Sequence, residues 1–107
     1  MAKFDELLDK LRGELKSLAE DHFGDYTEDA IQDGERMVAE IQGDLKKWTE
    51  QLESGKLTQL EFQFLIEQKK EVAKMQALKQ KGLAKIQIKK FQHELINTVT
   101  GLVEKYY

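Results

Sequence analysis

Three signals for a tight turn between two helices lie within Ser54-Gly55-Lys56-Leu57-Thr58-Gln59-Leu60-Glu61-Phe62. Gly55 can end a helix in the left-handed conformation, which glycine adopts without steric cost. Thr58 and Glu61 have the T-x-x-E spacing of a capping box, which begins a new helix. Leu57 and Phe62 have the spacing of a hydrophobic staple across the same cap. We therefore predict that the chain turns here and that the flanking helices are antiparallel neighbours.

Two helices are predicted before this turn, which we place at residues 54–58. Apolar residues recur at spacings of three and four from Ala2 to Phe23, which predicts an amphipathic helix. The segment Gly24-Asp25-Tyr26-Thr27 then supplies a break and, in Thr27, a residue suited to an N-cap. A second helix is expected from Glu28 to Glu53, with a buried stripe that includes Trp48.

Two isolated glycines, Gly34 and Gly43, fall within this second helix. Each costs about 1 kcal/mol relative to alanine in an exposed helix interior. They either mark close contacts between helices or are simply tolerated. We favour a structural role over a functional one.

The chain after the turn leaves two architectures open. No proline or cap cluster interrupts the helical pattern from Thr58 to Glu104, apart from a weak point at Gln80-Lys81-Gly82. A continuous helix of this length would span about 70 Å, more than twice the width of a compact chain with a radius of gyration near ~13 Å. It would have to dimerise to bury its apolar face. A bend near Gly82 would instead let one chain close its own bundle.

The composition agrees with an all-helical chain. There is no proline in 107 residues, and Leu, Lys, Glu, Gln and Ala are abundant. We therefore expect one all-α domain over residues 1–107, an elongated antiparallel helical hairpin or four-helix bundle with coiled-coil-like stripes. The absence of cysteine excludes disulfides, thiolate zinc sites and cysteine nucleophiles.

The two ends of the chain carry matching apolar stripes, which suggests association through helices. The C-terminal stripe repeats at spacings of four and three, like the stripe of the first helix. We expect a small scaffold or protein-interaction protein that forms a homodimer or binds another helical protein. The leucines expected to be buried against that partner are Leu8, Leu15, Leu95 and Leu102.

Charge is divided unevenly along the chain. Residues 1–54 carry a net charge of −8 and residues 55–107 a net charge of +5. Because the turn folds one half against the other, complementary charge along an antiparallel bundle is the simplest interpretation.

The alternative is that the basic segment from Lys69 to Lys90 binds a membrane surface or a polyanion. Eight lysines face only Glu71 among acidic residues in this segment. The absence of arginine, with only Phe91 nearby for stacking, argues against a nucleic-acid site. The lysines we expect to carry such binding are Lys81, Lys85, Lys89 and Lys90.

No motif for catalysis, a metal or a cofactor is present in the sequence. The glycines are isolated, and neither histidine has Glu three residues before it, as a di-iron bundle requires. If the chain folds about residue 56, His22 and His93 lie within about one helical turn of each other, which gives a weak hypothesis of a metal or proton-switch site. We expect no enzyme and no cofactor.

We expect a cytoplasmic protein. No stretch approaches the roughly 18 apolar residues of a membrane span, and the sequence after Met1 runs directly into charged residues.

Overall fold

The computed structural model describes residues 2–70 and 74–107, and every regular element in these ranges is a helix. The prediction of an all-α fold is therefore confirmed. The elements, in chain order, are α1 (Ala2–Phe23), the 3-10 helix η1 (Gly24–Tyr26), α2 (Thr27–Glu53), α3 (Gln59–Glu67), α4 (Gln76–Gln80) and α5 (Lys85–Tyr106).

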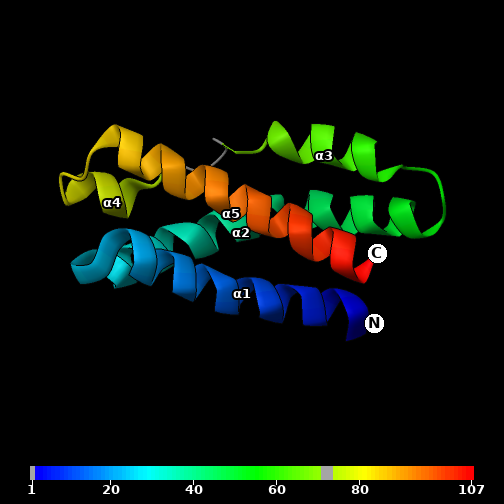
Figure 1. The fold of residues 1–107 in the computed structure, drawn as a ribbon, viewed down its shortest axis with the longest axis horizontal. Helices are drawn as coiled ribbons and strands as arrows, with labels where there is room; N and C mark the ends of the chain where they lie inside the picture. The colour runs from blue at the N-terminus through cyan, green and yellow to red at the C-terminus, as the bar shows by residue number, and fades with distance from the viewer. Residues whose placement is uncertain (1, 71–73) are drawn as a thin grey trace.

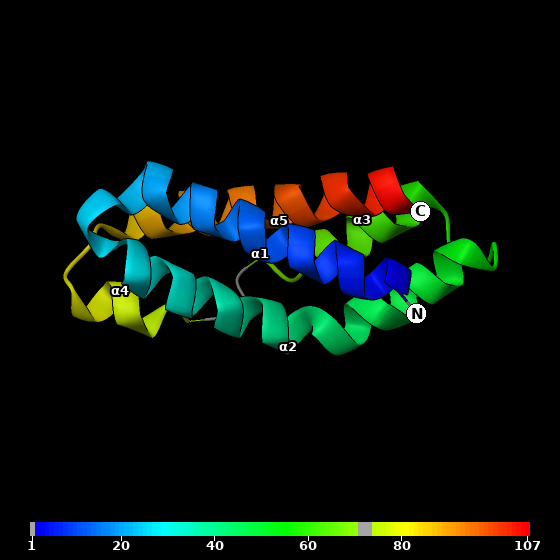
Figure 2. The ribbon, with the colours of Figure 1, turned by 90° about the horizontal axis from the view of Figure 1, so that it is seen from below.

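The helices form an elongated four-helix bundle whose third position is shared by two short helices. α1, α2 and α5 run along the long axis, while α3 and α4 follow each other along the remaining position (Figure 1). α1 packs against both α2 and α5, and the N- and C-termini lie at the same end (Figure 2). The extents are 44 × 24 × 19 Å and the Cα radius of gyration is 13.8 Å.

The turn at residues 54–58 is confirmed in its local detail. α2 ends in a Schellman motif, in which Gly55, at φ +80°, donates to the carbonyl of Leu52. The capping box then begins α3: the Glu61 N–H donates to Thr58 Oγ1 at 3.1 Å, and the Thr58 N–H donates to Glu61 Oε1 at 2.9 Å. Phe62 is fully buried, so the new helix is fixed to the core within its first turn.

The structure decides between the two architectures left open after the turn, because the chain from Thr58 to Glu104 is not one continuous helix. α3 ends at Glu67, and a second Schellman motif ends α4, with Gly82 at φ +77° donating to the carbonyl of Lys79 at 3.0 Å. Of the two architectures, the chain therefore adopts the one with a bend near Gly82. It returns the chain along the bundle, so that one chain covers its own apolar faces.

The first connection differs slightly from the expected one. α1 leads into η1 through Gly24, at φ +43°, and α2 already begins at Thr27. Thr27 is therefore not the N-cap that we predicted. Its hydroxyl donates instead to the carbonyl of Gly24 and tightens the connection.

The core lies along the inner faces of all the α-helices. Leu15 of α1 packs so closely on Gly34 of α2 that an added Cβ would lie 2.3 Å from Leu15 Cδ1, whereas Gly43 has nothing within 4 Å. Gly34 thus marks a close helix contact and Gly43 does not. Trp48 is half-buried against the core, edge-to-face with Phe62.

Candidate functional site

The four leucines expected at a partner interface lie in the core of the single chain. Leu8, Leu15 and Leu95 are 5%, 1% and 1% exposed, and Leu102 is half-buried against the same core. We had expected a second chain to cover them, but α1, α2 and α5 cover one another. These residues therefore pack within one chain, and their burial does not require a homodimer.

The exposed apolar side chains lie elsewhere. On α3, Leu60 is 77% and Phe64 is 69% exposed, and both line a shallow pocket of about 440 Å³. On α5, Ile86 is 81% exposed. The sequence carries a signal for the first pair, because residues 59–67 have apolar side chains on more than one face of a helix.

A larger pocket, of about 550 Å³, lies at the other end of this side of the bundle, where the chain passes from α4 to α5. Its volume is within the range of small-ligand sites, roughly 300–1,000 Å³. We call it the lysine pocket. Its lining residues are Lys74, Lys79, Leu83, Lys85, Ile88, Lys89 and Gln92.

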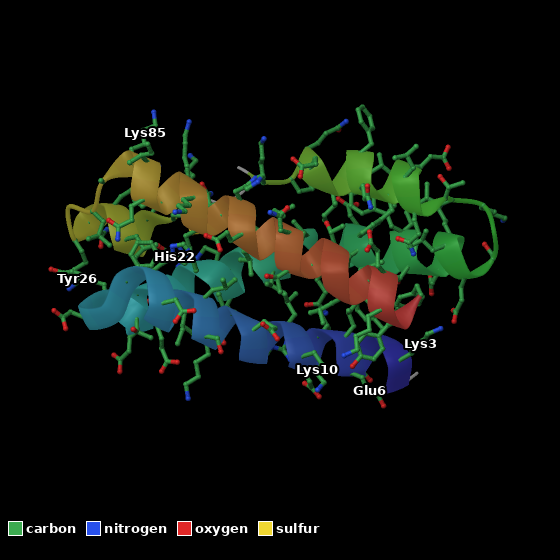
Figure 3. All side chains as sticks on the ribbon, in the orientation of Figure 1. Lys3, Glu6, Lys10, His22, Tyr26 and Lys85 are labelled. Carbon is green, nitrogen blue, oxygen red and sulfur yellow. The ribbon has the colours of Figure 1, made fainter. Side chains whose placement is uncertain are left out.

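The turn at Gly82 explains why lysines from separate helices meet there. Lys79 lies in the last turn of α4 and Lys85 in the first turn of α5, so the reversal between them brings the two side chains to one pocket. Lys85 projects from the outer edge of the bundle at the start of α5 (Figure 3). Ile88, 3% exposed, joins the pocket to the core. The pocket thus has an apolar inner side and basic walls.

The pocket has no negative charge among the described residues that line it. Lys74, Lys79 and Lys85 have no ion-pair partner in the described part of the chain. Lysine ammonium groups act as point charges with three donors each, which suits phosphate, sulfate or carboxylate groups.

The predicted basic residues are therefore divided between the pocket and the open surface. Lys85 and Lys89 line the pocket, whereas Lys81 and Lys90 are exposed outside it. Glu71, the acidic residue of the predicted basic segment, lies outside the described residues. The grouping of Lys74 and Lys79 with the α5 lysines could not be read from the sequence, because it depends on the turn.

At the start of the same basic segment, two lysines are already paired with acids. Lys69 Nζ lies 2.9 Å from Asp44 Oδ2 on α2, and Lys70 Nζ lies 3.7 Å from Glu67 Oε1. The Lys69 pair is an instance of the complementary charge that we expected between the two halves of the chain.

The two histidines do not form a paired site. His22 Nε2 lies 2.7 Å from Glu94 Oε2, and the His22 ring packs edge-to-face on Phe91, while His93 is exposed. The expected register is nearly right, since Glu94, the partner of His22, directly follows His93 in the sequence. Across residues 2–70 and 74–107, no cluster of three or more metal-ligating side chains occurs.

Comparisons with known proteins add no relative. The chain matches no family model, no curated protein and no solved structure. In the part of the chain that the structure describes, none of the helices is both long enough and apolar enough to cross a bilayer.

Proposed function

We propose that the protein is an anion-binding protein and that the lysine pocket holds a ligand with clustered phosphate groups. The observation that carries this proposal is the convergence of Lys74, Lys79, Lys85 and Lys89 on one pocket with no acidic residue among its described lining. We also propose that the protein is cytoplasmic.

The electrostatics of the pocket support a multivalent ligand. Like charges around one volume, such as those of Lys74, Lys79 and Lys85, repel each other. A bound polyanion removes that repulsion while it forms several charge-assisted hydrogen bonds. Without arginine, the pocket has no planar fork for a single carboxylate. Several separate phosphate oxygens suit separate ammonium groups better.

Tripolyphosphate is a suitable soluble probe, with its dissociation constant measured by calorimetry and its site by amide chemical shifts. The double variant Lys79→Gln and Lys85→Gln should weaken binding by about tenfold or more, because each charged hydrogen bond contributes about 1.5–3 kcal/mol. The double variant Lys10→Gln and Lys16→Gln on α1 removes the same charge away from the pocket, and should change binding by less than about twofold.

Two outcomes would overturn the proposal. One is the absence of tripolyphosphate binding at low salt. The other is an equal loss of affinity in both double variants, which would mean that the probe responds to net charge and not to the lysine pocket.

A second candidate function is the helix-mediated association that the sequence suggested, now through a different surface. Leu60 and Phe64 are one turn apart on α3, and both are largely exposed. Leu57 and Leu65 line the same shallow pocket. Contiguous exposed apolar residues favour an interaction site. Light scattering over a range of concentrations tests it: Phe64→Glu should lower a dimeric mass to that of the 12.4 kDa chain. A monomer at all concentrations would exclude the homodimer.

A further inference from the structure

Ile86 is the most exposed of the large apolar side chains in residues 2–70 and 74–107, at 81%. It lies in the first turn of α5, next to Lys85 of the lysine pocket. Lys89 and Lys90 follow at i+3 and i+4, so they lie on either side of Ile86 one turn further along the helix. The exposed Ile86 side chain is thus surrounded by the side chains of three lysines.

The Ile86 side chain points away from the bundle. Leu95, nine residues after Ile86, is 1% exposed, and nine residues turn a helix by about 180° from the starting direction. Ile86 therefore lies on the outer face of α5. Packing within the chain gives it no role, and binding of a small soluble anion in the lysine pocket does not require it.

The chain around Ile86 carries positive charge only. Residues 74–90 contain six lysines and no acidic residue, while the first half of the chain, which forms α1 and α2, has a net charge of −8. Lys85 and Glu6 lie on opposite edges of the bundle (Figure 3). An extended anionic surface would therefore attract the α4–α5 side and repel the α1 side, which orients the molecule.

We propose that the anion of the lysine pocket is the phosphate headgroup of an anionic lipid, and that the protein docks on a bilayer with Ile86 inserted between headgroups. This inference rests on the proposed function and names its ligand source. Lysines near an anionic bilayer add to its affinity, and one apolar side chain adds a modest, reversible anchor. The exposed apolar residues Leu60 and Phe64 on α3 fit docking on an anionic bilayer less well, because the acidic Glu61 lies beside them.

Co-sedimentation with vesicles tests the inference on the full chain. Vesicles of neutral phosphatidylcholine are compared with vesicles that also contain about one third phosphatidylserine, and tripolyphosphate binding is measured on the same samples. The unmodified protein should bind the mixed vesicles alone and dissociate at high salt.

The decisive variants differ in which exposed apolar residue they remove. Ile86→Ser should lower vesicle affinity by about fivefold or more, because it removes the inserted apolar area, and should leave tripolyphosphate binding unchanged. Leu60→Ser removes a residue of similar exposure on α3, and should alter vesicle affinity by less than about twofold.

The outcomes separate the two proposals. Tripolyphosphate binding without vesicle binding would overturn the lipid inference and leave the anion-binding function standing. Failure to bind either would overturn both. Equal binding to neutral and mixed vesicles, or equal losses in Ile86→Ser and Leu60→Ser, would also overturn the lipid inference, because neither the headgroup charge nor Ile86 would then decide binding.

Discussion

The carboxylate of Asp33, on α2, accepts a hydrogen bond from the backbone N–H of Leu78, on α4, at 2.8 Å. Its second oxygen accepts from the N–H of Ala77 at 3.1 Å. These amides are at the N2 and N3 positions of α4, where an N-cap side chain normally acts. The local N-cap residue, Met75, is left-handed at φ +50° and makes no side-chain cap. A residue 45 positions away therefore caps α4 and holds it against α2.

Asp33→Ala should lower the free energy of unfolding by about 1–3 kcal/mol, because two amides lose their acceptor in a buried place. Asp33 is 1% exposed, so water cannot easily replace its carboxylate. Urea denaturation measures the loss, and amide hydrogen exchange at Ala77 and Leu78 should accelerate. Glu35→Ala, which removes an exposed acid from the same helix, should stay within about 0.5 kcal/mol. Equal effects from both variants would contradict the capping role.

Gly34→Ala and Gly43→Ala should change stability in opposite directions. At Gly34 the added methyl would lie 2.3 Å from Leu15 Cδ1, and overpacking of this kind costs about 1–3 kcal/mol. At Gly43 nothing lies within 4 Å, so alanine should stabilise α2 by up to about 1 kcal/mol through helix propensity.

A double-mutant cycle identifies the cause. If the clash with Leu15 is responsible, Gly34→Ala should cost less in a Leu15→Ala background than in the unmodified chain. An unchanged cost, or stabilisation by Gly34→Ala alone, would show that the contact is not tight in solution.

The parts of the fold that the sequence predicts are those with local causes. The turn at residues 54–58 is specified by neighbouring residues, since Gly55 ends one helix and the pair Thr58 and Glu61 begins the next. The stripe of α1 is likewise local, and Leu11 lies at its fully buried centre. Such signals depend only on spacing along the chain, so they are visible without a structure.

The break between α3 and α4 has a long-range component that spacing does not show. Asp33 is one acidic residue among many in the first half of the chain, and its role as the cap of α4 exists only once α2 is in place. The buried face of α5 near its end also differs from the predicted one. Val99 and Val103 are buried there, whereas Leu102, which we predicted to be buried, is only half-buried. Both depend on the neighbours that the tertiary fold supplies.

The sequence shows the basic composition of the segment that forms the lysine pocket, but not the geometry of the pocket. The excess of lysine from Lys69 to Lys90 is evident from composition. Which lysines share a pocket depends on the reversal at Gly82, so Lys74 and Lys79 join Lys85 while exposed Lys81 does not. Composition can therefore indicate a ligand charge, but it does not group residues from two helices.

Leu95→Ala and Leu60→Ala compare a core leucine with an exposed one. Leu95 is 1% exposed, so its truncation should cost about 2–5 kcal/mol of unfolding free energy, through lost burial and the cavity left behind. Leu60 is 77% exposed, and its truncation should stay within about 0.5 kcal/mol. Thermal and urea unfolding of the unmodified protein and of the two variants measure both effects. Similar losses would mean that Leu60 is buried in solution, as in a dimer formed through α3.

Gly82→Ala should destabilise the chain and also weaken the lysine pocket. Gly82 has φ +77°, where a Cβ costs about 1–2 kcal/mol, although nothing lies within 4 Å to clash with it. Gly101, which lies within α5 and has the same open space, is the matched control, and Gly101→Ala should stabilise the chain by up to about 1 kcal/mol. Because the turn at Gly82 sets the separation of Lys79 from Lys85, Gly82→Ala should raise the tripolyphosphate dissociation constant, whereas Gly101→Ala should not. Equal behaviour of the two variants would show that backbone conformation at the turn does not shape the pocket.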